Sequence, residues 1–540
     1  MRRSLSLIAL ASAIAAVCVA VPAAASTSAR AARPTASAHT IKWGPCSGSR
    51  LKAAHAQCGY LSVPLNYSKP KGPQIKIAVS RIRHTSKHYQ GIILTNPGGP
   101  GGAGLNLNTY LIPVLKKEGF KQAADDYDWI GFDPRGVAAS KPAISCIPDY
   151  FHPDRPYYVP VTKKLLHHWL SSSKRYAHAC TTKGSAQTAL LHNLTTPDVA
   201  RDMNSIREAL GQKQLTYYGF SYGTYLGQVF ATMFPSRVRR LILDSNVDPR
   251  HVWYQSNLDQ DAPFNRNENI WFGWLAKYNK TYHLGSTEKA VHKLFYSTEQ
   301  RLRKHPAAGE IGPDEWVDAF LYAAYYQVTW PSEGAAFAAY INKHDTKPLI
   351  AAYKTADDPG NDNEFAVYLG VECTDAHWPH AWSRWSKDNN RIYKKAPFET
   401  WGNAWFNAPC IYWPAPSRTP LKINGKHIKS ALLIDQTLDA ATPFEGSEYV
   451  RSIFPHSVLL AEPGGTSHAD SLAGDLCVDG TIAKYLTTGA LPARKPGKKW
   501  DKTCKPLPQP KPSAAAAAKA PSVQPAPVPA LPGIAAVELR

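Results

Sequence analysis

Short apolar runs alternate with amphipathic stretches through the first half of the chain. The apolar runs are rich in β-branched and aromatic residues, which is typical of buried strands. We predict strands at residues 74–79, 91–95, 127–132, 214–218 and 238–243. Helical spacing is clearest between Thr195 and Gly211, where apolar residues recur every three or four positions. Strands that alternate with helices predict a mostly parallel sheet covered on both faces.

The pattern changes between residues 248 and 421. This stretch has helical spacing and is rich in Trp, Tyr and Asn, and strand-like runs return only at 428–434 and 457–461. An insertion of this size between two strands would lie over the carboxyl ends of the sheet. We therefore predict an α/β core in two parts, 40–249 and 421–493, and a helical cap formed by residues 250–420.

The two ends of the chain have compositions of their own. Arg2 and Arg3 precede an apolar run from Leu5 to Val21, which is followed by a cleavage site at Ala23-Ala24-Ala25. This order predicts a secretory signal peptide at 1–25, and a disordered or pro-segment at 26–39. The tail at 494–540 is basic, then rich in Pro and Ala, so we predict that it is disordered. No later stretch is apolar enough for a membrane span, and we expect a secreted protein.

Eight cysteines remain outside the signal peptide, which contains Cys18. An even number in an exported chain predicts disulfides, although the sequence leaves the connectivity open. A zinc site is the alternative, but the chain contains no C-x-x-C pair. Pairing of neighbours along the chain would give Cys46–Cys58, Cys146–Cys180, Cys373–Cys410 and Cys477–Cys504.

The formal net charge of +21 raises the question of a nucleic-acid partner. Most of the lysines and arginines are scattered, and no motif typical of RNA or DNA binding accompanies them. We expect no nucleic-acid partner, and a solvated basic surface that suits association with an anionic cell envelope. We also expect the protein to be a monomer.

Gly219-Phe220-Ser221-Tyr222-Gly223 indicates a nucleophile elbow. The predicted strand at 214–218 precedes it and a helix-forming stretch follows, so the serine would lie on a tight strand-to-helix turn. Glycines on both sides relieve the crowding of such a turn. The serine hydroxyl would then be exposed at a helix N-terminus, where backbone N–H groups favour a developing oxyanion. This arrangement predicts a serine hydrolase with an α/β-hydrolase fold.

A serine nucleophile needs a general base and a carboxylate that orients the base. In an α/β hydrolase these follow the nucleophile in the order acid, then histidine, each after a late strand. His468 is the only histidine after the strand at 457–461. Asp439 and Asp435 both follow the strand at 428–434; we favour Asp439, which lies further into the loop, and keep Asp435 as the alternative.

The oxyanion hole should combine two backbone N–H groups. One belongs to Tyr222, directly after the nucleophile, and the other comes from the glycine-rich segment at 97–102. We favour Gly99 for the second, with its neighbour Gly98 as the alternative. A phosphate-binding loop is excluded because no Lys-Ser or Lys-Thr follows these glycines. The predicted chemistry needs neither a metal nor a cofactor.

Several motifs together resemble the secreted bacterial tripeptidyl aminopeptidases, which are α/β-hydrolase peptidases related to proline iminopeptidases. The likeness extends over roughly residues 43–492 and rests on 96–101, 131–136, 219–224, 438–443 and His468. The resemblance implies a triad of Ser221, Asp439 and His468, a helical cap, and release of short peptides from free N-termini.

An aminopeptidase of this kind must recognise a substrate ammonium group, for which a buried carboxylate is suited. Glu372 and Asp375, on either side of Cys373, are the candidates; a structural role for both is the alternative. Peptides are therefore the expected partners. A secreted carboxylesterase or lipase would need the same triad, and a catalytically silent peptide-binding envelope protein is a further alternative.

Overall fold

The computed structural model describes residues 40–512. The predicted signal peptide at 1–25, the segment at 26–39 and the last part of the predicted tail, 513–540, lie outside the described residues. No helix within residues 40–512 combines the length and the apolar character that a membrane span requires.

Ten strands form one sheet in the described part of the chain, in the order β1-β2-β3-β5-β4-β6-β7-β8-β9-β10. The pairs from β1 to β5 are antiparallel and those from β5 to β10 are parallel, which confirms the predicted, mostly parallel sheet. The strands are β1 (Gly44–Pro45), β2 (Gln57–Pro64), β3 (Gln74–Ile82), β4 (Ile92–Asn96), β5 (Asp128–Asp133), β6 (Leu215–Phe220), β7 (Val238–Asp244), β8 (Ala431–Gln436), β9 (Ser457–Glu462) and β10 (Lys502–Thr503).

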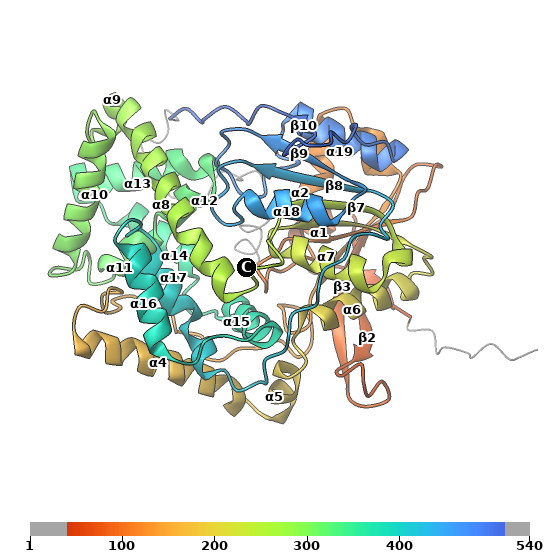
Figure 1. Cartoon of the computed structure of the whole chain (residues 1–540), viewed down its shortest axis with the longest axis horizontal. Helices are drawn as coiled ribbons and strands as arrows, with labels where there is room; N and C mark the ends of the chain where they lie inside the picture. The colour runs from red at the N-terminus through yellow and green to blue at the C-terminus, as the bar shows by residue number, and fades with distance from the viewer. Residues whose placement is uncertain (1–39, 513–540) are drawn as a thin grey trace, which may run out of the picture. The chain divides into compact units, whose positions relative to one another are not determined.

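Helices cover both faces of this sheet (Figure 1). Alternate residues of each strand point to opposite faces, so that Ile93 packs in one apolar cluster and Leu94 in the other. One face is covered by α2 (Asn108–Lys117), α3 (Lys121–Asp125) and α19 (Leu476–Thr488). The other is covered by α6 (Thr196–Ala209), α7 (Tyr222–Met233) and α18 (Glu445–Ile453). Two short elements, α1 (Ser49–Ala53) and η1 (Pro235–Arg237), complete this part.

The chain between β7 and β8 is helical and forms the cap, drawn in green and cyan in Figure 1. Its interior is a separate aromatic cluster that includes Trp271, Phe295, Trp316 and Phe337. The elements are α8 (Tyr254–Lys277), α9 (Asn279–Tyr282), α10 (Glu288–Leu302), α11 (Pro313–Asp318), α12 (Leu321–Tyr325), η2 (Gln327–Thr329), α13 (Trp330–Lys343), α14 (Lys347–Asp357), α15 (Asn363–Asp375), α16 (Trp382–Tyr393), α17 (Thr400–Asn407) and η3 (Ala408–Tyr412).

A segment before the elbow, with α4 (Lys163–Thr182) and α5 (Ser185–Leu191), also packs on the cap helices. The Trp169 ring stacks on that of Trp405, with the ring centres 5.8 Å apart. The buried guanidinium of Arg155 bonds to carboxylates of α11 and α14, at 2.9 Å from Glu315 and 2.6 Å from Asp318 and Asp357. Part of the range 40–249 therefore packs against the cap helices.

Four disulfides join cysteines that are neighbours along the chain: Cys46–Cys58, Cys146–Cys180, Cys373–Cys410 and Cys477–Cys504. Each closes a local loop, with a sequence separation of 12 to 37 between the paired cysteines. Such cross-links stabilise a fold mainly by restricting its unfolded chain.

Residues 494–512 differ from the predicted disordered tail. The buried Asp501 forms an ion pair with Arg451 at 2.7 Å, and Cys504 is held in its disulfide. Beyond it the backbone carbonyls of Leu507 and Pro510 accept hydrogen bonds from cap side chains. These long-range contacts order a segment that has no periodicity of its own.

Candidate active site

Ser221 occupies a strained turn between β6 and α7. Its backbone φ of 56° and ψ of −127° lie outside the regions that residues with a side chain usually adopt. The turn requires glycine at both flanks: a Cβ on Gly219 would lie 2.4 Å from the carbonyl oxygen of Gly223, and one on Gly223 would lie 2.8 Å from Asn96 Oδ1. The sequence motif thus folds into the elbow that its spacing predicted, with Ser221 at the helix N-terminus.

Asp439 and His468 are in direct contact. Asp439 Oδ2 lies 2.8 Å from Nδ1 of His468, and both residues are at most 2% exposed. The carboxylate is held in place because Oδ1 accepts hydrogen bonds from the backbone N–H groups of Ala441 and Thr442. The hydroxyl of Thr442 donates to Oδ2 at 3.0 Å and lies 3.3 Å from the same imidazole nitrogen. This geometry fixes the orientation of the imidazole ring.

Asp435, the alternative acid, has a different environment. Its Oδ2 accepts a hydrogen bond from Ser447 on α18, at 2.5 Å. Burial, together with the nearby Asp439 charge, raises the pKa of Asp435 well above its usual value. A carboxyl group that bonds to α18 is suited to a structural role.

The loop of His468 is anchored by both the core and the cap. Its backbone N–H donates to the carbonyl of Tyr325 in α12 at 2.9 Å, and the N–H of Ala469 donates to the hydroxyl of Ser245. The rings of Tyr325 and His468 meet edge to face at 5.8 Å. The cap therefore contributes directly to the position of the histidine.

Ser221 opens into a cavity of about 170 Å³ between the sheet and the cap. Tyr325, Ala441 and Thr442 line the same cavity, so that the elbow and the loop carrying Asp439 meet there. Among the described residues, the Ser221 hydroxyl has no hydrogen-bond partner, the His468 ring included. In enzymes without substrate such hydrogen bonds are often long and shorten when substrate binds.

The glycine-rich loop after β4 packs against the elbow. A Cβ on Gly98 would lie 2.9 Å from Cβ of Ser221 and 3.3 Å from the backbone nitrogen of Tyr222, so only glycine fits. The N–H of Gly98 donates to Asn96 Oδ1 at 3.1 Å and is therefore engaged. Gly99 lines the cavity together with Ser221 and Tyr222.

Two carboxylates from the cap line the cavity, Glu372 on α15 and Glu399 just before α17. Glu372 is 3% exposed and accepts a hydrogen bond from Asn257 at 3.1 Å. Burial raises its pKa to about 8. Glu399 Oε2 is buried without a hydrogen-bond partner, and burial raises the pKa of this residue well above its usual value. No Lys or Arg is among the residues that line this cavity.

Asp375, the second predicted ammonium ligand, is turned into the fold and does not line the cavity. Its Oδ1 accepts a hydrogen bond from the backbone N–H of Thr196 at 2.8 Å, and its Oδ2 accepts one from the Thr196 hydroxyl. It therefore joins the end of α15 to the start of α6. Because both of its oxygens accept hydrogen bonds from Thr196, Asp375 is not placed to reach a group in the cavity of Ser221.

Sequence reasoning missed Glu399 and Thr442 at this site. Glu399 lies far from the elbow along the chain, and nothing in its local sequence distinguishes it from the other acidic residues of the cap. Thr442 belongs to the 438–443 motif, and a hydroxyl three residues after an acid is well placed to bond to it.

Several known proteins are similar to this chain. The model of the α/β hydrolase fold family matches residues 91–471. The chain is 38% identical to the tripeptidyl aminopeptidase of Streptomyces coelicolor over 478 residues, which are 86% of each chain. It is 28% identical to the serine protease Hip1 of Mycobacterium tuberculosis, over 84% of this chain and 89% of that one. It is also 28% identical to carboxylesterase B of the same organism, over 81% and 85% of the two chains.

Proposed function

The chain belongs to the tripeptidyl aminopeptidase family of α/β hydrolases and is a serine peptidase. We propose that it is a secreted exopeptidase that releases short peptides, in particular tripeptides, from free N-termini. The observation that carries the proposal is a single cavity that contains Ser221 and the cap carboxylates Glu372 and Glu399. A peptide with a free N-terminus presents an ammonium group at one end and a scissile carbonyl a few residues away. The cavity offers a complementary group to each.

The proposed reaction is acyl transfer through a covalent intermediate. Ser221 Oγ attacks the scissile carbonyl carbon while Nε2 of His468 accepts the hydroxyl proton, and Asp439 stabilises the resulting imidazolium. When the carbon–nitrogen bond breaks, His468 gives this proton to the leaving amine. Water then gives a proton to His468 and attacks the carbonyl carbon of the acyl-enzyme. When the bond to Ser221 Oγ breaks, His468 returns this proton to Oγ, and the short peptide leaves with a new carboxylate.

The tetrahedral intermediates carry a negative oxygen, which we propose is bound by the N–H groups of Gly99 and Tyr222. The position of both residues beside Ser221 in the cavity supports this assignment. The dipole of α7, whose N-terminus is at Tyr222, favours negative charge at the same place. Donors fixed before reaction stabilise the transition state without the cost of reorganisation.

The cap carboxylates would set where the peptide is cut. An ammonium group bound at Glu372 or Glu399 fixes the distance from the N-terminus to the carbonyl that reaches Ser221. Burial favours the protonated form of Glu372, and a substrate ammonium beside it would favour the ionised form. An acetylated N-terminus has no charge and would leave the carboxylates buried without a counter-ion.

Location outside the cell is part of the proposal. It is supported by the signal-peptide pattern at 1–25 and by four disulfides, which persist in oxidising compartments.

The test compares a chromogenic tripeptide amide with its N-acetylated form, for the wild type, Glu372→Gln and Glu399→Gln. Loss of a charge-assisted contact should lower kcat/KM for the free peptide by about 10–100-fold in at least one variant, without affecting the acetylated peptide. Glu364→Gln is the matched control, because Glu364 is also on α15 but does not line the cavity. Equal rates for the free and acetylated peptides would contradict exopeptidase activity and favour the carboxylesterase alternative.

A further inference from the structure

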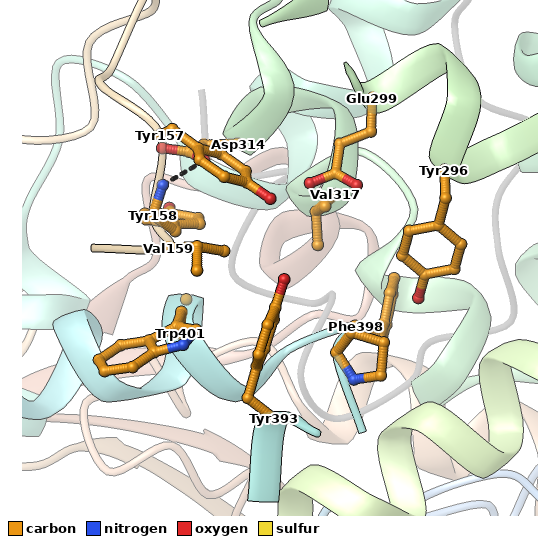
Figure 2. Close-up of a pocket in the computed structure, with 12 residues that line it drawn as sticks. Tyr157, Tyr158, Val159, Tyr296, Glu299, Asp314, Val317, Tyr393, Phe398 and Trp401 are labelled. Carbon is orange, nitrogen blue, oxygen red and sulfur yellow. Dashed lines mark hydrogen bonds between the residues drawn. The ribbon is translucent and has the colours of Figure 1, made fainter. Parts of the chain in front are cut away.

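The cap contains a second cavity, of about 20 Å³, which the proposed reaction does not use. Residues 157–159, α10, α11, α16 and α17 contribute to its walls (Figure 2). Helix α17 separates it from the active-site cavity: Asn403 and Phe406 face the cavity of Ser221, whereas Trp401 and Gly402 face the second one. A cavity volume of roughly 10–15 Å³ is enough for one water molecule. The second cavity therefore has room for one particle about as large as a water molecule.

Aromatic rings and carboxylates line this second cavity. Figure 2 shows the Glu299 carboxylate and the hydroxyl groups of Tyr157 and Tyr393 turned toward the space between them. The rings of Tyr158, Tyr296, Phe398 and Trp401 complete the aromatic lining. No Lys, Arg or His is among the lining residues, and the nearby Arg303 guanidinium stacks on the Tyr157 ring, 4.5 Å from its centre.

One carboxylate oxygen at this cavity lacks a hydrogen-bond partner, Oδ2 of Asp314. Asp314 is 1% exposed, and its Oδ2 is buried without a hydrogen-bond partner, while Oδ1 accepts the N–H of Tyr158 at 2.8 Å. Glu299 is 7% exposed. Glu268, which accepts the Tyr296 hydroxyl at 2.9 Å, adds a further buried acid behind the wall. A buried carboxylate oxygen that bonds to nothing in the protein indicates that a ligand can complete the site.

We propose that this cavity binds a monovalent cation of the size of ammonium or K⁺. The sign of the charge follows from Glu299 and Asp314, and the size follows from the volume. Tyrosine and tryptophan faces attract cations through their ring quadrupoles, and tyrosine hydroxyl oxygens can act as ligands. Ca²⁺ prefers six to eight oxygen ligands, which a wall made largely of aromatic rings does not offer. The inference goes beyond the proposed peptidase function and does not depend on it.

Cation binding at this site would be coupled to the loss of protons from its carboxyl groups. Burial raises the pKa of Glu299 to about 7, while a hydrogen bond from Tyr157 and the nearby Arg303 charge oppose this rise. Burial and the neighbouring Glu315 likewise raise the pKa of Asp314 well above its usual value. A cation in the cavity would favour the ionised form of both carboxyl groups.

Thermal unfolding of the whole protein in different chloride salts tests the proposal. At equal ionic strength of about 0.2 M, K⁺ and ammonium should raise Tm by about 1–3 °C over tetramethylammonium, which is too large for the cavity. The difference should disappear in Glu299→Gln. It should remain in Glu288→Gln, the matched control, because Glu288 is exposed on the same helix.

Equal Tm values in all salts, or a preference that survives in Glu299→Gln, would overturn the proposal. If Glu299→Gln does not fold, Tyr393→Phe removes one hydroxyl from the cavity and should at least halve the K⁺ effect; an unchanged effect would again contradict the site. Crystals grown with Rb⁺, whose anomalous scattering identifies it, should show a peak between Glu299 and Tyr393. A water molecule there instead would also overturn it.

Discussion

Asp439 Oδ2 lies 2.8 Å from Nδ1 of His468, at a point where both side chains are almost completely buried. The carboxylate accepts further hydrogen bonds from its own loop, so its position is fixed before any substrate arrives. A fixed carboxylate at Nδ1 orients the imidazole and leaves Nε2 free to accept the hydroxyl proton of Ser221. The contact between Asp439 and His468 is therefore a part of the proposed mechanism that is present without substrate.

Replacement of Asp439 tests the role of this pair. Asp439→Asn keeps the shape of the side chain but offers the imidazole an amide, and kcat should fall by about 10⁴-fold. Asp435→Asn is the matched control, because Asp435 bonds to Ser447 and should leave kcat within a few-fold of the wild type. Steady-state kinetics on a tripeptide amide measures both. An equal loss in the two variants would contradict the assignment.

Asn96 should position the glycine-rich loop. Its Oδ1 accepts the N–H of Gly98 and lies close to Gly223 of the elbow, so Asn96→Ala should loosen the oxyanion hole. We expect kcat to fall by about 10–100-fold with little change in KM. Asn108→Ala removes a buried asparagine that bonds to Thr95 and should reduce stability alone. If Asn108→Ala reduces kcat as much as Asn96→Ala, the effect is not specific to the loop.

Stability should decrease as the pH rises from about 4.5 to 8. Burial raises the pKa of Glu333, on α13, to about 8 from its usual 4.5. Between these values the folded protein keeps a proton that the unfolded chain has lost, so the stabilisation present below pH 4.5 is lost as the pH approaches 8. Asp470, with a pKa raised to about 8, and Glu462, with one raised to about 9, act in the same direction.

Glu333→Gln isolates one of these groups, since glutamine stays neutral at every pH. Its Tm should fall by about 2–4 °C less than that of the wild type between pH 5 and pH 8. Differential scanning calorimetry at the two pH values measures the difference. Parallel curves for the two proteins would show that Glu333 is ionised in the folded state.

The parts of the fold that depend on interactions between residues close in sequence could be predicted from the sequence. The strand before the elbow, the elbow itself and the helix after it follow from apolar runs, a glycine pair and helical spacing over about twenty residues. The preference for Asp439 over Asp435 also followed from position in the loop after a strand. In the structure Asp439 contacts His468 and Asp435 bonds to Ser447, and the catalytic role of Asp439 stays a prediction.

Parts of the site that depend on packing between distant segments could not be predicted in this way. Glu372 and Asp375 are one helical turn apart, and only the contact of α15 with α6 shows that Asp375 is used by Thr196. Glu399 reaches the cavity because α17 packs beside α8 and α15. Strand β10 consists of two residues whose pairing with β9 depends on neighbouring side chains and a disulfide. Each of these contacts joins residues that are far apart in the chain, so no short stretch of sequence predicts it.

Covalent labelling with a fluorophosphonate tests the central claim most directly. The reagent reacts with a serine hydroxyl only where a neighbouring base activates it, so digestion and mass spectrometry should locate one adduct on Ser221. The adduct should be absent in Ser221→Ala and form much more slowly in His468→Ala, with both variants folded like the wild type. No adduct on the folded wild type, or one on another serine, would contradict the account.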